Sequence, residues 1–192
     1  DSDKIVEAIK TMIEDYNTMM AEIKAAYSTM PYQKSNGSFA NYEPLTEEDR
    51  QGMTESAIER YEEKAKQGIL FGDRNLSNLY EKLRNVFNLP GEDGAALRAM
   101  GITTSYSISD GSETVTLDEN KLRDMLESNP ERVTEVFTKT DGYGGVMQNM
   151  KAHLDNYAKT TGEPKGILIQ QAGSPLSSLS LLNNSWQKEI EN

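Results

Sequence analysis

The chain is most informative at first through what it lacks. Its 192 residues include no cysteine, which excludes disulfides, thiolate metal sites and cysteine nucleophiles, and is typical of exported bacterial proteins that avoid wrong oxidation. No apolar run approaches the roughly 20 residues that a membrane helix requires. Positive charge is also scarce: the chain has 20 Lys and Arg residues and 31 Asp and Glu residues, which gives a net charge of −11. Phosphate backbones and anionic membranes would repel such a chain, so neither is expected as a partner.

Recognisable catalytic and metal-binding patterns are scarce as well. His153 is the only histidine; we expect it at the solvated edge of a helix, with no partner nucleophile in reach. Asp110-Gly-Ser and Asp141-Gly-Tyr-Gly lack the alternating oxygen ligands of a calcium loop. No glycine-rich phosphate-binding motif occurs, and no sequence pattern identifies two carboxylates as the acid–base pair of a hydrolase cleft. The sequence therefore predicts no enzyme, no cofactor and no metal.

The stretch between residues 100 and 137 changes its hydrophobic period twice. Apolar or β-branched residues recur at every second position, with Asp110-Gly111 between the two halves, which predicts an antiparallel hairpin over about residues 102–117. The strand positions are Ile102, Thr104, Tyr106, Ile108, Val115 and Leu117. The spacing then becomes helical over 118–127, with Asp118 as its N-terminal cap. Asn129-Pro130 opens another helix over 130–138.

A long amphipathic helix is predicted at 3–29, ending before Pro31. Its apolar residues follow steps of four and three, which fits a coiled coil and a bundle helix equally well. They are Ile5, Ile9, Met12, Tyr16, Met19, Ile23 and Ala26. Further helices are expected at 54–67, 74–88, 146–160 and 175–192. The fold class is thus α+β and mainly α: an elongated helical bundle with a small antiparallel β-hairpin.

Several connecting segments are predicted between these elements. Residues 31–52 form a long loop whose aromatic side chains we expect to pack back onto the bundle, with contact to a partner as the alternative. Residues 89–94 are predicted to be a turn, and residues 95–100 at most a short helix. Residues 141–145 carry three glycines and are predicted to be a flexible joint, while residues 167–169 are predicted to be a short strand or extended piece.

A series of short motifs gives the chain a resemblance to a known family. Asp15-Tyr16-Asn17, Tyr42-x-Pro-Leu-Thr46 and Ala65-Lys-x-Gly-Ile-Leu70 precede Asp73 and Leu76; Gly101-Ile102, Thr116-Leu117-Asp118, Asn129-Pro130, Gly144-Gly145 and Gly166-Ile-Leu-Ile169 follow in order. Together they resemble the C-terminal conserved region of the bacterial flagellar filament cap protein, also called hook-associated protein 2. The residues taken as its structural motif are Tyr16, Asn17, Gly68, Leu70, Asp73, Gly101, Ile102, Leu117, Asp118, Gly144 and Gly145.

The resemblance implies a structural protein that is exported through the flagellar secretion channel and lies outside the cell at the filament tip. Its subunits would form a ring, commonly of five, that retains flagellin and promotes its assembly; flagellin and an export chaperone would be its partners. Residues 1–192 would be the return half of the leg domain, without the family's plate domains and terminal coiled coils. The absence of an initial methionine indicates a fragment, whose own ability to oligomerise stays open.

Two other functions remain open at this point. One is adhesion to host mucin or to another cell surface. The other is a different axial flagellar protein, either a hook–filament junction protein or flagellin itself, since both share export and long helical rods. The hairpin and the Gly68–Asp73 link argue against these axial relatives.

Overall fold

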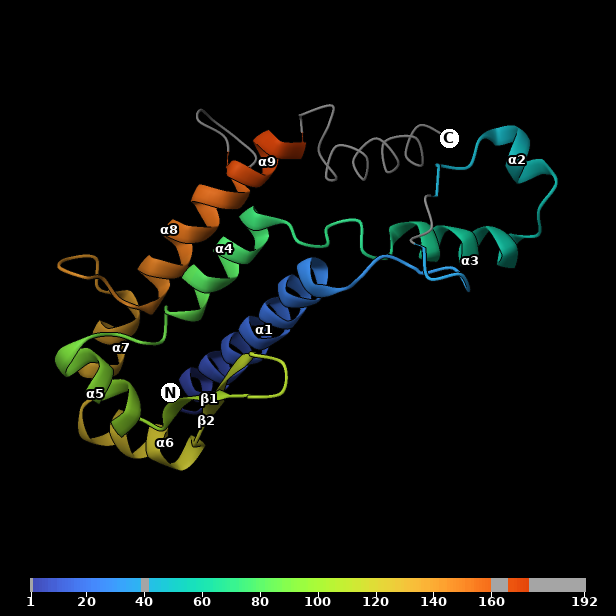
Figure 1. The fold of residues 1–192 in the computed structure, drawn as a ribbon. Helices are drawn as coiled ribbons and strands as arrows, with labels where there is room; N and C mark the ends of the chain where they lie inside the picture. Colours follow the sequence, from blue (N-terminus) through green and yellow to red (C-terminus); the bar gives the residue numbers. More distant parts are fainter. Residues whose placement is uncertain (1, 39–41, 160–165, 173–192) are drawn as a thin grey trace.

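The computed structural model describes residues 2–38, 42–159 and 166–172, and its fold is mainly helical with one two-stranded antiparallel hairpin (Figure 1). The fold class predicted from the sequence is therefore confirmed. The elements in chain order are α1 (Ser2–Ser28), α2 (Glu47–Gln51), α3 (Glu55–Lys66), α4 (Arg74–Arg84), α5 (Gly91–Ala99), β1 (Ile102–Tyr106), β2 (Glu113–Leu117), α6 (Glu119–Ser128), α7 (Pro130–Thr138), α8 (Val146–Ala158) and α9 (Ile167–Ala172).

The body of the molecule is built on α1, which packs against α4, while α8 covers the other side of α4 (Figure 1). At 1.5 Å per residue, the 27 residues of α1 extend about 40 Å. Its buried residues are Val6, Ile9, Ile13, Tyr16 and Met20. The predicted seam was therefore partly wrong. It shares Ile9 and Tyr16 with this set, and its residues Met12, Met19 and Ile23 pack half-buried against the core, whereas Ile5 is 42% exposed. The buried line is rotated by about one position because α4 and α6 both contact the helix.

The end of the body near the N-terminus is closed by α5, α6, α7 and the hairpin (Figure 1). The predicted caps of this region are confirmed. The Asp118 side chain accepts hydrogen bonds from the first backbone amides of α6, and Asn129 does the same for α7, in which Pro130 is the first residue. Leu122 and Val136, both fully buried, anchor these short helices in the same continuous core as α1 and α4.

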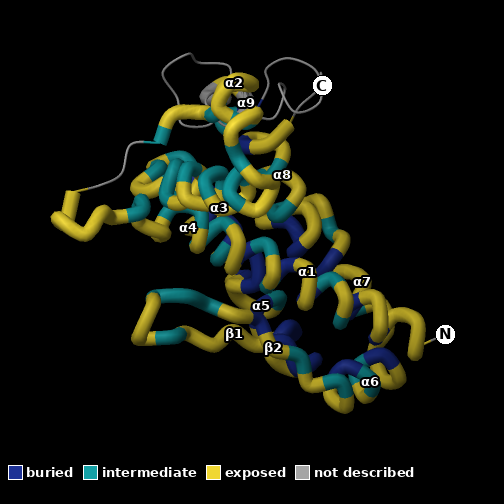
Figure 2. Tube along the Cα trace, turned by 90° about the vertical axis from the view of Figure 1, so that its right-hand side faces the viewer, coloured by how far each residue is buried: buried dark blue, intermediate teal, exposed yellow. Residues whose placement is uncertain are grey.

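The segment between α1 and α4 forms an arm, defined here as the described residues 29–38 and 42–73, which projects away from the body (Figure 1). Neither α2 nor α3 contains a buried residue, as the exposed and half-buried colouring of Figure 2 shows. The expectation that the loop aromatics pack back onto the bundle was wrong for Tyr32 and Tyr42, while Phe39 lies outside the described residues. Instead, Tyr42 stacks edge-on against Tyr61 of α3, with ring centroids 5.1 Å apart, and Tyr32 lies 6.2 Å from Tyr42.

Several local predictions differ from the structure. The loop predicted over residues 31–52 contains the short helix α2, and the helix predicted over 74–88 ends at Arg84. Residues 89–94 are not a turn, because α5 begins at Gly91, where Glu92 and Asp93 favour a helix N-terminus. Residues 167–169 are helical in α9, since a short apolar run fits a helix as well as a strand. Ile108 lies beyond the end of β1 and is 91% exposed. The predicted helix 175–192 lies outside the described residues.

Candidate functional site

Asn17 joins the middle of α1 to the hairpin. Its side-chain amide donates to the carbonyl oxygen of Val115 at 2.8 Å, and its amide oxygen accepts from the backbone N–H of Val115 at 2.9 Å. The asparagine amide thus pairs with the outer edge of β2 as a neighbouring strand would. Val115 itself is 4% exposed, so both of its backbone groups would otherwise be shielded from water without a partner.

Tyr16, the residue before Asn17, joins α1 to the end of α4. Its hydroxyl donates to the carbonyl oxygen of Leu83 at 2.8 Å, and its ring meets Phe87 edge-on at 4.9 Å between centroids. Burial raises the pKa of the Tyr16 hydroxyl well above its ordinary value. The Tyr16 hydroxyl is therefore a neutral hydrogen-bond donor that satisfies one of the last carbonyl groups of α4, and it does not act as an acid or a base.

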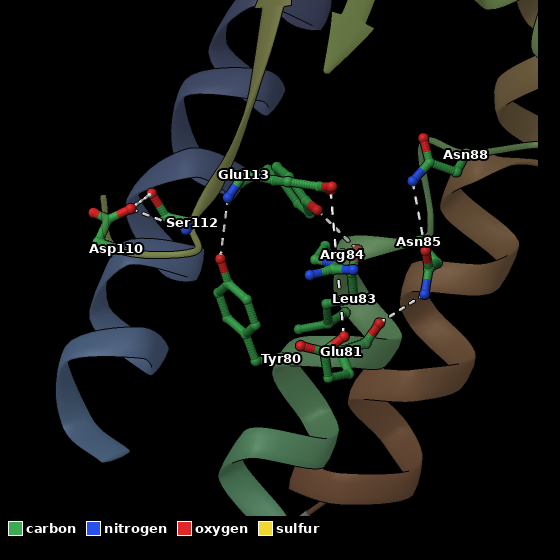
Figure 3. Close-up of polar contacts among 10 residues, drawn as sticks. Tyr80, Glu81, Leu83, Arg84, Asn85, Asn88, Asp110, Ser112 and Glu113 are labelled. Atoms are coloured by element: carbon green, nitrogen blue, oxygen red, sulfur yellow. Dashed lines mark hydrogen bonds and ion pairs between the residues drawn. The ribbon is translucent and has the colours of Figure 1, made fainter. Parts of the chain in front are cut away.

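The start of β2 rests on α4 through Tyr80, Arg84 and Glu113 (Figure 3). The backbone N–H of Glu113 donates to the Tyr80 hydroxyl at 3.3 Å. Arg84 Nε lies 3.8 Å from Glu113 Oε2 and 3.6 Å from Glu81 Oε2, in ion pairs that are too long for hydrogen bonds. Arg84 Nε and Glu113 Oε2 are both buried without a hydrogen bond in the described part of the chain, so this charge pair is held loosely.

We call these residues the hairpin seat; they are Tyr16, Asn17, Tyr80, Arg84, Glu113 and Val115. The sequence marked only Tyr16 and Asn17 among them as motif residues, and Val115 as a strand position. Tyr80 has the helical spacing of a core residue, and nothing in the local sequence marks Arg84 and Glu113 as partners. Their pairing depends on the packing of the hairpin on α4, which no short-range pattern reveals.

Four other predicted motif residues meet at the base of the hairpin. Ile102 faces Leu117 in the first pair of the strand register, and the N–H of Asp118 donates to the carbonyl oxygen of Gly101 at 2.9 Å. Gly101 has a φ of +85°, and a β-carbon there would lie 2.6 Å from the Asp118 carbonyl oxygen. Only glycine fits both the backbone angle and the close approach, which fixes where the hairpin leaves α5 and enters α6.

The remaining motif residues lie away from the hairpin seat. Gly68 and Leu70 lie at the base of the arm, where a β-carbon on Gly68 would lie 2.2 Å from the backbone nitrogen of Pro31. Asp73 caps α4 by accepting from the Leu76 amide at 2.9 Å. Gly144 and Gly145 lie between α7 and α8, where the N–H of Gly145 donates to the carbonyl oxygen of Lys139 at 2.8 Å. Flexibility of this joint stays a prediction.

The residues examined for chemistry have structural surroundings. His153 lies half-buried on α8, where burial lowers its pKa and the charge of Lys82 lowers it further. Asp110 accepts hydrogen bonds from the hydroxyl and amide of Ser112, which lower the pKa of its carboxyl to about 2. Within residues 2–38, 42–159 and 166–172, no group of three or more His, Cys, Asp or Glu side chains could hold a metal. In the same residues, no helix is long and apolar enough to cross a bilayer.

These features describe a structural helical domain, in which the polar side chains of the hairpin seat and of the helix caps fix the positions of backbone elements. Comparison with known proteins specifies the class. Residues 1–192 match the family model described as flagellar hook-associated protein 2 C-terminus, and the chain belongs to this family.

Two curated relatives carry the name flagellar hook-associated protein 2. The protein from Halalkalibacterium halodurans is 30% identical over 142 residues, which cover 72% of this chain and 25% of the relative. The protein from Thermotoga maritima is 30% identical over 179 residues, which cover 90% of this chain and 25% of the relative. The chain thus spans about a quarter of the length of these relatives. No solved structure matches it.

Proposed function

We propose that this chain is part of a structural subunit of the flagellar filament cap, which retains exported flagellin at the filament tip and promotes its assembly. The observation that carries the proposal is the family match over residues 1–192. The hairpin seat supports it, because Asn17 and Tyr80 hold the hairpin against α1 and α4 through their polar groups, and Tyr16 joins these two helices. Such a domain is suited to a mechanical role in an assembly.

Within that subunit, residues 1–192 form the return half of the leg domain. Copies of the subunit associate in a ring, with five copies expected. Each copy contacts the next head to tail, and these heterologous contacts close the ring. Its further partners are flagellin and an export chaperone, and its place is the extracellular tip of the flagellum, reached through the flagellar secretion channel. The continuous core that links α1, α4, α6, α7 and α8 is consistent with a leg that transmits force as one body.

The test is deletion of the gene that encodes the chain. Flagellin in the culture medium is then compared with flagellin in attached filaments, before and after the gene is restored. The proposal expects monomeric flagellin in the medium and missing filaments, with both defects repaired by the restored gene. A restored gene lacking the residues of this chain serves as the matched control, and we expect it to fail.

The same experiment separates the alternatives. Normal filaments combined with lost attachment to mucin-coated surfaces would refute the cap role and favour adhesion. Hooks that carry no filament at all, with no rescue when purified cap protein is added outside the cell, would place the chain at the hook–filament junction instead.

A further inference from the structure

The turn between α7 and α8 is closed by its own backbone hydrogen bonds, although residues 141–145 include three glycines (Figure 1). The N–H of Gly144 donates to the carbonyl oxygen of Asp141 at 3.0 Å, and the N–H of Gly145 donates to that of Lys139 at 2.8 Å. Gly144 and Gly145 are buried, as is Val146 at the start of α8. A buried and paired backbone group moves only when its hydrogen bond opens, so this turn is held like part of the core.

The side chain of Asn149, in the first turn of α8, reaches back into the same segment. Its amide nitrogen Nδ2 lies 3.2 Å from the carbonyl oxygen of Tyr143, 3.3 Å from that of Gly144 and 3.0 Å from that of Gly145. Only the amide nitrogen can face three carbonyl oxygens, because the amide oxygen has no hydrogen to donate. One side chain thus holds three successive carbonyl groups of the turn in place.

The turn also lies directly against the end of α7, which accounts for its last two glycines. A β-carbon on Gly145 would lie 2.6 Å from the carbonyl oxygen of Val136 and 2.9 Å from that of Phe137. Gly144 has a φ of +82°, in the left-handed region that side chains disfavour. These two glycines therefore serve a close contact and a backbone angle, and their presence does not indicate mobility.

Lys139, the residue that ends α7, ties the turn to α5 as well. Its backbone carbonyl accepts the hydrogen bond from Gly145, and its side-chain Nζ lies 2.8 Å from Asp93 Oδ2. Both side chains of this ion pair are half-buried, so solvent screens it less than it would a pair on the open surface. Three helices, α5, α7 and α8, thus meet at Lys139 and at the turn that follows it.

We propose that residues 139–149 form a rigid corner, clamped by the Asn149 side chain, which makes α7 and α8 move as one body. Asn149 is a positioning residue, because it acts on the backbone of the turn and not on a ligand. The inference goes beyond the cap function proposed above, since the stiffness of the corner is a property of the chain whether or not it caps a filament. A hinge at residues 141–145 would let the body bend between α7 and α8, whereas this corner forces any bending to occur elsewhere.

The first test measures backbone order parameters of the 192-residue chain by NMR relaxation. Rigid backbone gives values of about 0.85 and flexible backbone values below about 0.6. We expect Gly144 and Gly145 to reach the rigid value and to match Met150, which lies inside α8. Values in the flexible range at these two glycines would overturn the proposal and establish a hinge.

The second test measures amide hydrogen exchange at Gly145 in the variant Asn149→Ala. The matched control is Asn156→Ala, the same substitution at an exposed position of the same helix. We expect exchange at Gly145 to become about tenfold faster in Asn149→Ala and to stay unchanged in the control, since one net hydrogen bond has that order of effect. Equal exchange in the two variants would overturn the role of Asn149.

Asn149→Asp provides a second variant in case the alanine substitution prevents folding. It keeps the size of the side chain but replaces the donor by an oxygen that faces the same three carbonyl groups, so exchange at Gly145 should again become faster at about pH 7. Exchange at the rate of the unaltered chain would refute the clamp. Both measurements are made on the purified chain, so a gene deletion that releases no flagellin would refute the cap function and leave the corner standing.

Discussion

Replacing Asn17 tests whether the hairpin is held by a side chain that acts as a strand. Asn17→Ala removes both hydrogen bonds to Val115, which are 2.8 and 2.9 Å long. Because Val115 is 4% exposed, its N–H and C=O would lose their partners with little access to water. Two lost bonds and two poorly satisfied groups give an expected destabilisation of about 2–3 kcal/mol.

The assay is urea unfolding followed by far-UV circular dichroism. Thr18→Ala is the matched control, because Thr18 is exposed at the next position of α1 and its replacement should change stability by no more than about 0.5 kcal/mol. If Asn17→Ala falls in the same range as this control, the side-chain pairing contributes nothing and the reasoning fails.

Asn17→Asp separates the two hydrogen bonds. The introduced carboxylate can still accept from the Val115 N–H, but it also faces the Val115 carbonyl oxygen that the lost amide donor contacted. This repulsion raises the folded-state pKa of the introduced carboxyl above its unfolded value. The stability deficit relative to the unaltered chain should therefore be full at about pH 7 and shrink toward about pH 4.5, where a protonated carboxyl can donate to the carbonyl. A deficit that does not change with pH would contradict this account.

Three further changes probe other parts of the body. Asp93→Asn removes the carboxylate that Lys139 contacts at 2.8 Å. Because this hydrogen bond lowers the pKa of Asp93, it stabilises the fold above the ordinary carboxyl pKa, and the stabilisation is lost as the pH falls through the lower folded-state pKa. The Tm difference between the variant and the unaltered chain should therefore disappear in acid. Gly101→Ala should destabilise by about 2 kcal/mol more than Gly111→Ala, since both glycines have positive φ but only the first meets a backbone atom under 3 Å away; equal losses in thermal melts would contradict the close-contact argument. Leu122→Ala should cost about 2–5 kcal/mol in the same unfolding assay, because Leu122 is completely buried, and a loss below about 1 kcal/mol would mean that α6 is not part of the core.

Local signals predicted the helix caps and the hairpin well because their causes are local. Asp118 and Asn129 cap their helices through contacts within three residues, which a sequence pattern can express. The hairpin follows from residue alternation and from Asp110-Gly111, although its loop, residues 107–112, is longer than the tight turn that this pair favours. The face of α1 was harder to place, since Ile5 and Val6 are equally apolar and only the positions of α4 and α6 decide which is buried.

The hairpin seat shows where prediction from sequence ends. Asn17 and Val115 are separated by 98 positions, and nothing near Asn17 indicates an edge strand as its partner. The same holds for the arm, whose aromatics were assigned to the bundle because a long loop with tyrosines usually returns to the core. Their actual partner, Tyr61, lies on a helix of the arm itself. Both cases depend on which elements meet in space, information that residue periodicity does not contain.

The closeness of the two ends of the arm has a practical consequence. The N–H of Gly72 donates to the carbonyl oxygen of Tyr27 at 2.8 Å, so the chain leaves and re-enters the body at neighbouring points. In topological terms the arm is an insertion, and the body does not depend on it for core packing, since α2 and α3 contain no buried residue. Evolution or a protein engineer can therefore shorten, exchange or replace this module by a tight connection while α1 and α4 keep their alignment. The base of the arm is a natural grafting point for a reporter or a foreign binding domain.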